Sequence, residues 1–190
     1  MTGEGPQPGG RPPAPGELGL VQAFINTHYD LHEHEAEVLA SPEALGRWLA
    51  SHRLLGADAP ISAPDLRRAL AVREGLRTFA GGRADASALA ALSGARVEIH
   101  FEPHGPRLEP TDPRTVTGAI AVLLGIVARE ILSGRWSRLK VCPGHECGWA
   151  STGAPDDAHL AKHKAANGAI RRIHYRKRCI CWHRGMQRGR

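Results

Sequence analysis

The sequence predicts an α+β protein: a mostly helical body with a small antiparallel β-hairpin or sheet, followed by a small C-terminal zinc-finger-like segment. Three observations support this fold class. Apolar residues recur at spacings of three and four after typical helix N-caps. One short stretch near residue 100 alternates apolar and polar side chains instead. All four cysteines lie in the last third of the chain.

The length and composition are those of one domain with a small appendage. The chain has 190 residues, of which 42% are hydrophobic. Its longest uncharged apolar run, residues 118–128, is shorter than the roughly 20 residues that a membrane span needs, so it predicts a buried helix. The start lacks the basic and apolar regions of a secretory signal. We therefore expect a cytoplasmic protein with reduced cysteines and no membrane partner.

The first residues predict a leader and then the body. Residues 1–16 contain five prolines and five glycines and almost nothing apolar, which is typical of a disordered segment. We expect the body to span residues 17–134, and it opens with a short apolar element that runs into Asn26 and Thr27.

Three helices are predicted next. Ser41-Pro42 is typical of a helix start, and a second start stands at Ser62. The helix after Ser62 carries apolar residues at spacings of three and four until Gly81-Gly82 stops it. Residues 85–92 predict a further short helix.

A hairpin and a central helix complete the predicted body. Residues 95–102 alternate as a half-buried strand does, and residues 107–110 are suited to the return strand. The next helix is expected to begin at Asp112-Pro113 and, being apolar on nearly all sides, to lie at the centre of the core.

The sequence offers no catalytic constellation. It lacks the phosphate-binding loop, the dinucleotide-binding glycine motif and the nucleophile elbow. His28, His32 and His34 cluster with two glutamates, but without the H-E-x-x-H spacing, so a solvated polar helix face or loop is the better interpretation. We expect a protein that is not an enzyme.

Charge divides the chain into two parts. Residues 1–133 carry 12 Lys and Arg against 16 Asp and Glu, whereas residues 134–190 carry 13 against 3. A basic, cysteine-bearing segment after an acidic body indicates nucleic-acid binding. The basic side chains that we expect to neutralise phosphates are Arg171, Arg172, Arg176, Lys177 and Arg178.

The cysteines indicate a zinc site of which one half is clear. Cys142 and Cys147 flank a Pro-Gly turn as a C-x4-C knuckle, and tetrahedral zinc needs a second pair of ligands. His159 and His163 lie four residues apart and would share a helix face. Cys179 and Cys181 are the alternative pair, and a third alternative is that no site is complete.

At this knuckle the chain resembles the CGNR zinc-finger family, whose N-terminal half is the ABATE domain, a stress-induced transcription regulator. The matching segments are VQAFINT at 21–27, SPEALGRWL at 41–49, the helix before the cysteines, and LKVC and CGW at 139–142 and 147–149. The resemblance implies a regulatory body at residues 17–134 and a zinc-finger region at 135–190.

The resemblance ends after Trp149. The family's aromatic-Asp element, Ser-Arg-Asn segment and Trp-Cys-Ser…Cys-Gly-Asn-Arg motif, which supply the second cysteine pair and the basic helix, do not follow. Loss of one base in codons for Ala-Phe-Tyr would give Ala-Ser-Thr, the residues at 150–152. A shifted reading frame after Ala150 is therefore a hypothesis that sequencing of the locus would test.

Two functions remain open. The first is a DNA-binding transcriptional regulator with a structural zinc knuckle, whose body senses a signal or forms a homodimer. The second is a ligand- or protein-binding module with a vestigial finger. In that case Asn26, His100 and His104 would line a pocket, although a turn-capping Asn26 and solvent-facing histidines fit the sequence better.

Overall fold

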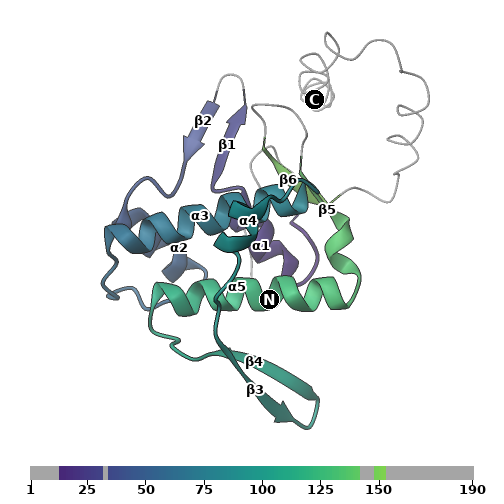
Figure 1. Ribbon diagram of the computed structural model, residues 1–190. Helices are drawn as coiled ribbons and strands as arrows, with labels where there is room; N and C mark the ends of the chain where they lie inside the picture. Colours follow the sequence, from purple (N-terminus) through teal and green to yellow (C-terminus); the bar gives the residue numbers. More distant parts are fainter. Residues whose placement is uncertain (1–12, 32–33, 142–147, 153–190) are drawn as a thin grey trace, which may run out of the picture.

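The computed structural model describes residues 13–31, 34–141 and 148–152 (Figure 1). Within them lie five α-helices, one 3-10 helix and three two-stranded antiparallel sheets. The helices are α1 Leu18–Ile25, α2 Pro42–Ser51, α3 Ala63–Ala80, α4 Ala86–Ala91, α5 Val116–Leu132 and the 3-10 helix η1 Arg135–Arg138. The strand pairs are β1 His28–Leu31 with β2 His34–Glu37, β3 Val97–Glu102 with β4 Gly105–Pro110, and β5 Leu139–Val141 with β6 Ala150–Thr152. The predicted mostly helical α+β body with small antiparallel sheets is confirmed, whereas most of the predicted zinc-finger-like segment lies outside the described residues.

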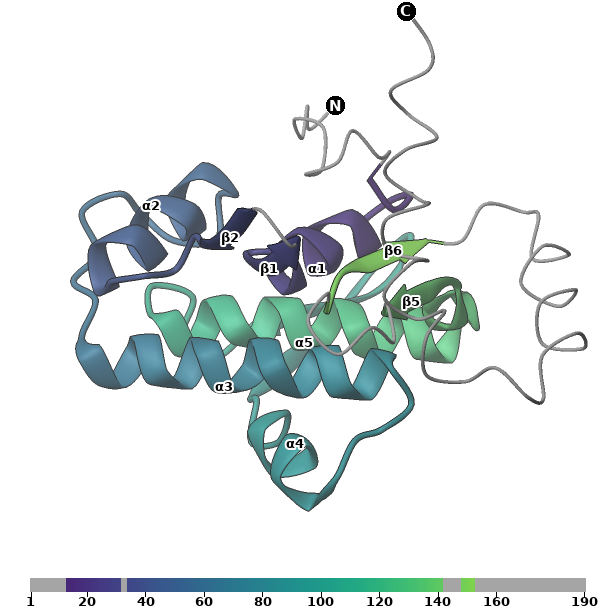
Figure 2. The same ribbon diagram turned by 90° about the horizontal axis from the view of Figure 1, so that it is seen from above.

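The core lies between α1, α3 and α5. Figure 2 shows α3 and α5 running side by side, with α1 and α2 on one side of them. Helix α5 contributes the largest share of buried residues, as its nearly continuous apolar sequence predicts. Phe24 of α1 packs against Trp48 of α2 with ring centroids 5.3 Å apart, which ties α2 to the same core. No helix in the described ranges is long and apolar enough to cross a membrane.

The helix starts confirm most of the predicted caps. Ser41, Ser62 and Asp85 each accept a hydrogen bond from a backbone N–H of the first turn, and Ser62 forms a reciprocal capping box with Asp65. Helix α5, however, begins at Val116 and not at Asp112-Pro113, because Thr115 is its N-cap. Asp112 instead offers its carbonyl to the Thr115 hydroxyl at 3.0 Å.

The histidine-rich segment after α1 forms strands. The sequence suggested a polar helix face or loop for His28, His32 and His34. His32 lies outside the described residues, but β1 and β2 pair with His28 opposite Glu37 and Leu31 opposite His34. A polar segment can form the backbone hydrogen bonds of a strand pair as readily as it forms a loop. The Val38 N–H donates to the Thr27 carbonyl at 2.8 Å, which joins the two ends of the hairpin.

The second hairpin exists where the sequence placed it, but it is not half-buried. All six residues of β3 are exposed, and Phe101 keeps 85% of its surface accessible. The hairpin projects beyond α5 (Figure 1), and only its β4 side lies against that helix. Its alternating pattern therefore marks a face that the described part of the chain leaves uncovered.

Both predicted boundaries of the body fall inside packed structure. Ala14, within the predicted leader, is buried and donates its N–H to the Gln22 side-chain oxygen at 2.6 Å. At the other end, η1 follows α5 directly, and the β5–β6 hairpin packs against α1 and α3. The body thus extends on both sides of residues 17–134.

Candidate functional site: the hairpin that carries the cysteine loop

The predicted ligands and DNA contacts lie outside the described residues, whereas the hairpin next to them is described. The predicted site residues outside the described ranges are Cys142, Cys147, His159, His163, Cys179, Cys181, Arg171, Arg172, Arg176, Lys177 and Arg178. Within the described part of the chain, no three metal-ligating side chains gather. The candidate site is therefore built from the residues that hold the cysteine loop.

The β5–β6 hairpin brings the two ends of the cysteine loop together. Val141, the last residue of β5, pairs with Ala150, the first residue of β6. Cys142 follows Val141 directly in the sequence, and Cys147 precedes Gly148, so both thiols belong to the segment that this pair closes. The Cα atoms of directly opposite residues in an antiparallel pair lie about 4.5–5.5 Å apart, so Val141 and Ala150 close the ends of this segment.

Ala150 is anchored to the body by two buried amide side chains. Its backbone N–H donates to the Asn26 side-chain oxygen at 2.8 Å, and its carbonyl accepts from the Asn26 side-chain nitrogen at 2.9 Å. Gln22, one turn earlier on α1, donates to the same carbonyl at 3.2 Å. The Asn26 amide thus acts toward β6 as a neighbouring strand would. Asn26 is buried at the C-terminal end of α1, whereas His100 and His104 are exposed on the second hairpin.

Arg77 of α3 joins the end of α1 to the start of β1 and lies beside Gly148, which leads into β6. Its guanidinium donates to the carbonyls of Ile25 and His28 at 2.7 and 2.8 Å. Gly148 lies against this side chain: a Cβ added there would be 3.2 Å from the Arg77 Cδ and Nε. The φ of Gly148 is +52°, a left-handed conformation that glycine adopts without strain. A side chain at position 148 would therefore displace Arg77 or the loop.

A second arginine, Arg73, fixes the first hairpin to α3. Its side chain is 5% exposed, and its guanidinium binds both carboxylate oxygens of Glu37 at 2.7 and 2.8 Å. Burial of the Glu37 carboxylate raises its pKa, but hydrogen bonds from Arg73 and from the Leu39 N–H outweigh burial. The pKa of Glu37 therefore lies below its ordinary value.

Replacing Glu37 by glutamine is expected to lower the free energy of unfolding by about 2 kcal/mol at pH 7. Loss of a buried pair's partner costs more than this, but Glu37 keeps a third of its side chain in water, which reduces the effect. A lowered pKa means that the wild-type pair stabilises the protein above pH 4.5 and loses this contribution as the pH falls further. The difference between the two proteins should therefore shrink below pH 4.5.

Urea unfolding between pH 3 and 7 measures this difference. Glu17→Gln is the control, because the Glu17–Arg129 pair is a surface contact expected to contribute about 0.5 kcal/mol or less. A Glu37→Gln effect that is equally small, or that grows as the pH falls, would contradict the assigned role of the pair.

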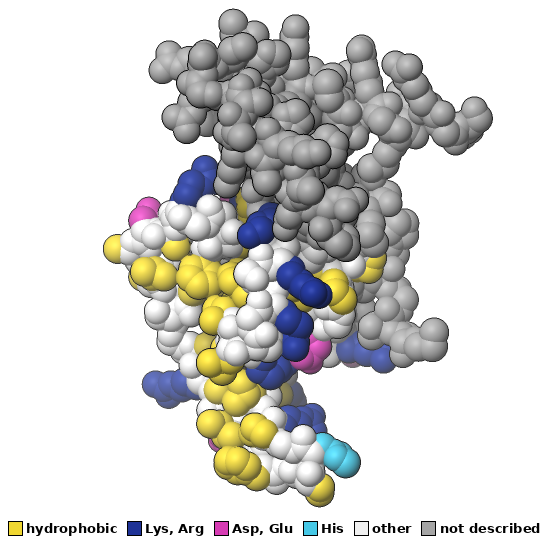
Figure 3. Space-filling model, turned by 90° about the vertical axis from the view of Figure 1, so that its right-hand side faces the viewer, with side chains coloured by type: hydrophobic (Ala, Val, Ile, Leu, Met, Phe, Trp, Pro, Cys, Tyr) yellow, Lys and Arg dark blue, Asp and Glu magenta, His cyan; other side chains and the backbone are white. Residues whose placement is uncertain are grey.

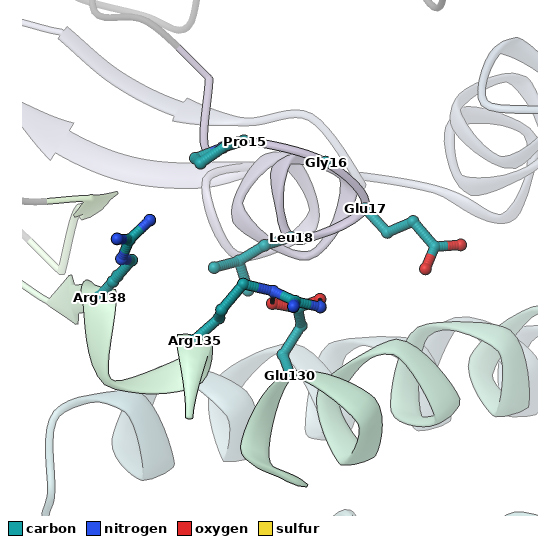
Figure 4. Close-up of a pocket in the computed structure, with 7 residues that line it drawn as sticks. All are labelled: Pro15, Gly16, Glu17, Leu18, Glu130, Arg135 and Arg138. Atoms are coloured by element: carbon teal, nitrogen blue, oxygen red, sulfur yellow. Dashed lines mark hydrogen bonds and ion pairs between the residues drawn. The ribbon is translucent and has the colours of Figure 1, made fainter. Parts of the chain in front are cut away.

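A hollow in the described surface lies between the start of α1 and η1 (Figure 4). Arg135 binds both carboxylate oxygens of Glu130 at 2.8 and 2.9 Å, beneath Leu18. Arg138 stands apart from that pair. The hollow is open, and two of its charged side chains, Glu130 and Arg135, pair with each other, so we interpret it as a structural junction between α1 and η1.

Sequence reasoning missed both arginines. Residues 69, 73, 76 and 80 share one face of α3, so Arg73 stands between positions that the periodicity assigns to the core. A charge in an apolar helix face is the signal that could have revealed it, but its partner Glu37 lies 36 residues away in sequence. Asn26 gave no such signal, since an asparagine after a helix ordinarily caps it.

Comparison with known proteins adds a family. Residues 18–133 match a family model, ABATE, with the description "Putative stress-induced transcription regulator". The match starts at the first residue of α1 and ends one residue after α5, and it covers more than half of the chain. The description is that of a regulator and not of an enzyme. No curated protein matches the chain.

Proposed function

The chain belongs to the ABATE family of stress-induced transcription regulators, and from that premise we propose that it binds DNA through a zinc knuckle presented by the β5–β6 hairpin. The observation that carries the proposal is the anchoring of Ala150. A two-strand hairpin is marginal by itself, so the buried contacts with Gln22 and Asn26 are what hold the end of the cysteine loop on the body. The body and the knuckle then act as one unit.

The donor chemistry of the loop suits zinc. Two thiolates from a closed hairpin loop are typical of one half of a structural zinc site. Cys142 and Cys147 would supply this half. His159 with His163, or Cys179 with Cys181, would supply the other half. Bound zinc would supply folding free energy to the basic segment and no reaction chemistry.

The charge distribution supports DNA as the partner. The excess of positive charge begins at η1, immediately before the anchored hairpin, and continues through Arg171, Arg172, Arg176, Lys177 and Arg178. Phosphate contacts by such residues make affinity depend strongly on salt. The acidic body would be repelled from the duplex, and the hairpin would turn the basic segment toward the DNA.

Zinc content of the purified full chain tests the proposal. We expect one zinc per chain, and its loss in Cys142→Ser because the remaining ligands cannot hold a structural zinc. The double variants His159→Ala/His163→Ala and Cys179→Ser/Cys181→Ser identify the second pair, since one should lose the metal and the other should retain it as the matched control.

Absence of zinc from the wild-type chain, prepared with zinc present and without chelator, would contradict the knuckle. Retention of zinc in Cys142→Ser would contradict the assigned ligand. The first result would favour the other function, a ligand- or protein-binding module whose finger is vestigial.

A further inference from the structure

The β3–β4 hairpin presents an apolar face that the described residues of the chain leave uncovered. Val97, Ile99 and Phe101 lie on one side of β3 and are 37, 60 and 85% exposed. The exposed fraction of these side chains rises toward the turn of the hairpin. β4 is the strand that lies against the body: Leu108, opposite Ile99, is near Gly125 of α5. Figure 3 shows the apolar side chains gathered on this projecting part of the molecule.

Among the residues that the structure describes, none pairs with the outer edge of β3. β3 pairs with β4 alone among the described strands, and β4 is the strand that packs on α5. Thr111 donates its N–H to the Arg96 carbonyl at 3.3 Å. Because hydrogen-bonded residues alternate along an antiparallel strand, the even-numbered residues of β3 are the ones that bond to β4. The backbone groups of Val97, Ile99 and Phe101 therefore point outward, where another strand could bind them.

We propose that β3 pairs antiparallel with β3 of a second copy of this chain, with Ile99 opposite Ile99 of that copy. The two hairpins then form one four-stranded sheet across a twofold axis. An isologous contact of this kind uses the same surface on both chains and closes after two copies. This inference concerns the body and stands independently of zinc or DNA binding.

The hydrogen-bonding pattern and the charges select this register. Outward backbone groups belong to odd-numbered residues, so odd residues must face odd residues. Only two such registers overlap β3 over five residues. The register centred on His100 would place Glu98 opposite Glu102 of the other copy twice, which is repulsive. The register centred on Ile99 instead places Glu98 opposite His100 and Arg96 opposite Glu102.

A second copy fits this edge better than nucleic acid does. The hairpin and its flank carry three glutamates, Glu98, Glu102 and Glu109, against the two arginines Arg96 and Arg107, so the surface does not attract phosphates. His100 already lies 3.5 Å from Glu98 and 3.7 Å from Glu109 within one chain. In the chosen register Val97 faces Phe101 of the other copy, which continues the apolar strip across the axis.

Sedimentation velocity of the full chain over a range of concentrations tests the proposal. We expect a dimer, and we expect Ile99→Lys to raise its dissociation constant at least tenfold, because two lysines would meet on the twofold axis. Leu132→Lys is the matched control: Leu132 is 87% exposed at the end of α5, outside the hairpin, and its replacement should leave the dimer unchanged. Circular dichroism confirms that each variant is folded.

A charge exchange tests the register itself. Arg96→Glu and Glu102→Arg should each weaken the dimer, since each places like charges opposite one another, and the double variant should restore it to within about threefold. A chain that stays monomeric at all concentrations would overturn the proposal. So would a dimer that Ile99→Lys leaves intact, and a double variant that is no better than the single ones would overturn the register.

Discussion

Replacing Arg171, Arg172, Arg176, Lys177 and Arg178 together by glutamine is expected to weaken binding to duplex DNA by about 100-fold or more at 0.1 M salt. Each phosphate contact releases counterions and contributes about 0.9 to the slope of log affinity against log salt. Loss of five contacts should therefore lower the magnitude of that slope by up to about 4.5. Fluorescence anisotropy with a labelled duplex, titrated at several salt concentrations, measures both quantities.

The body offers a control with the same change in charge. Arg47, Arg53, Arg67, Arg83 and Arg114 are exposed on the body and outside the proposed DNA contacts. Their replacement by glutamine lowers the net charge equally and should change the affinity by about threefold or less. Equal effects of the two sets would show attraction by net charge alone and would contradict a DNA-binding segment at residues 171–178.

The helices could be predicted from the sequence because their signals are local. Ser41, Ser62 and Asp85 each accept from a backbone N–H three residues away, so a short stretch of sequence contains both partners. The apolar run of α5 is local in the same sense. The start of α5 lies a few residues after the predicted one, because Asp112 and Thr115 are both good N-caps. The choice between them depends on the chain passing close over Gly118, where an added Cβ would lie 1.9 Å from the Asp112 carbonyl oxygen.

The contacts of the candidate site could not be predicted because they join distant segments. Asn26 and Ala150 are 124 residues apart, and Glu37 and Arg73 are 36 residues apart. Neither pair leaves a periodic pattern. The exposed β3 illustrates a different limit: alternation shows that one face is apolar, but not whether this chain or a second one covers it.

Replacing Asn26 by alanine is expected to lower the free energy of unfolding by about 3 kcal/mol. The change removes two hydrogen bonds and leaves the N–H of the fully buried Ala150 without its partner, while Gln22 still reaches the carbonyl. Orphaned buried backbone groups cost about 1–3 kcal/mol each. Ser137→Ala is the control, because the Ser137 hydroxyl makes an exposed hydrogen bond to Gly134 close to the same hairpin, and about 0.5 kcal/mol is expected there.

Amide hydrogen exchange distinguishes how the stability is lost. If the β5–β6 hairpin is part of the body's cooperative unit, Asn26→Ala should accelerate exchange at Ala150 and in α1 together, since opening of one then requires opening of the other. Acceleration at Ala150 alone, with unchanged global stability, would mean that the hairpin opens independently of α1. The cysteine loop would then lack a fixed orientation on the body. This result would contradict the proposal that the body and the knuckle act as one unit.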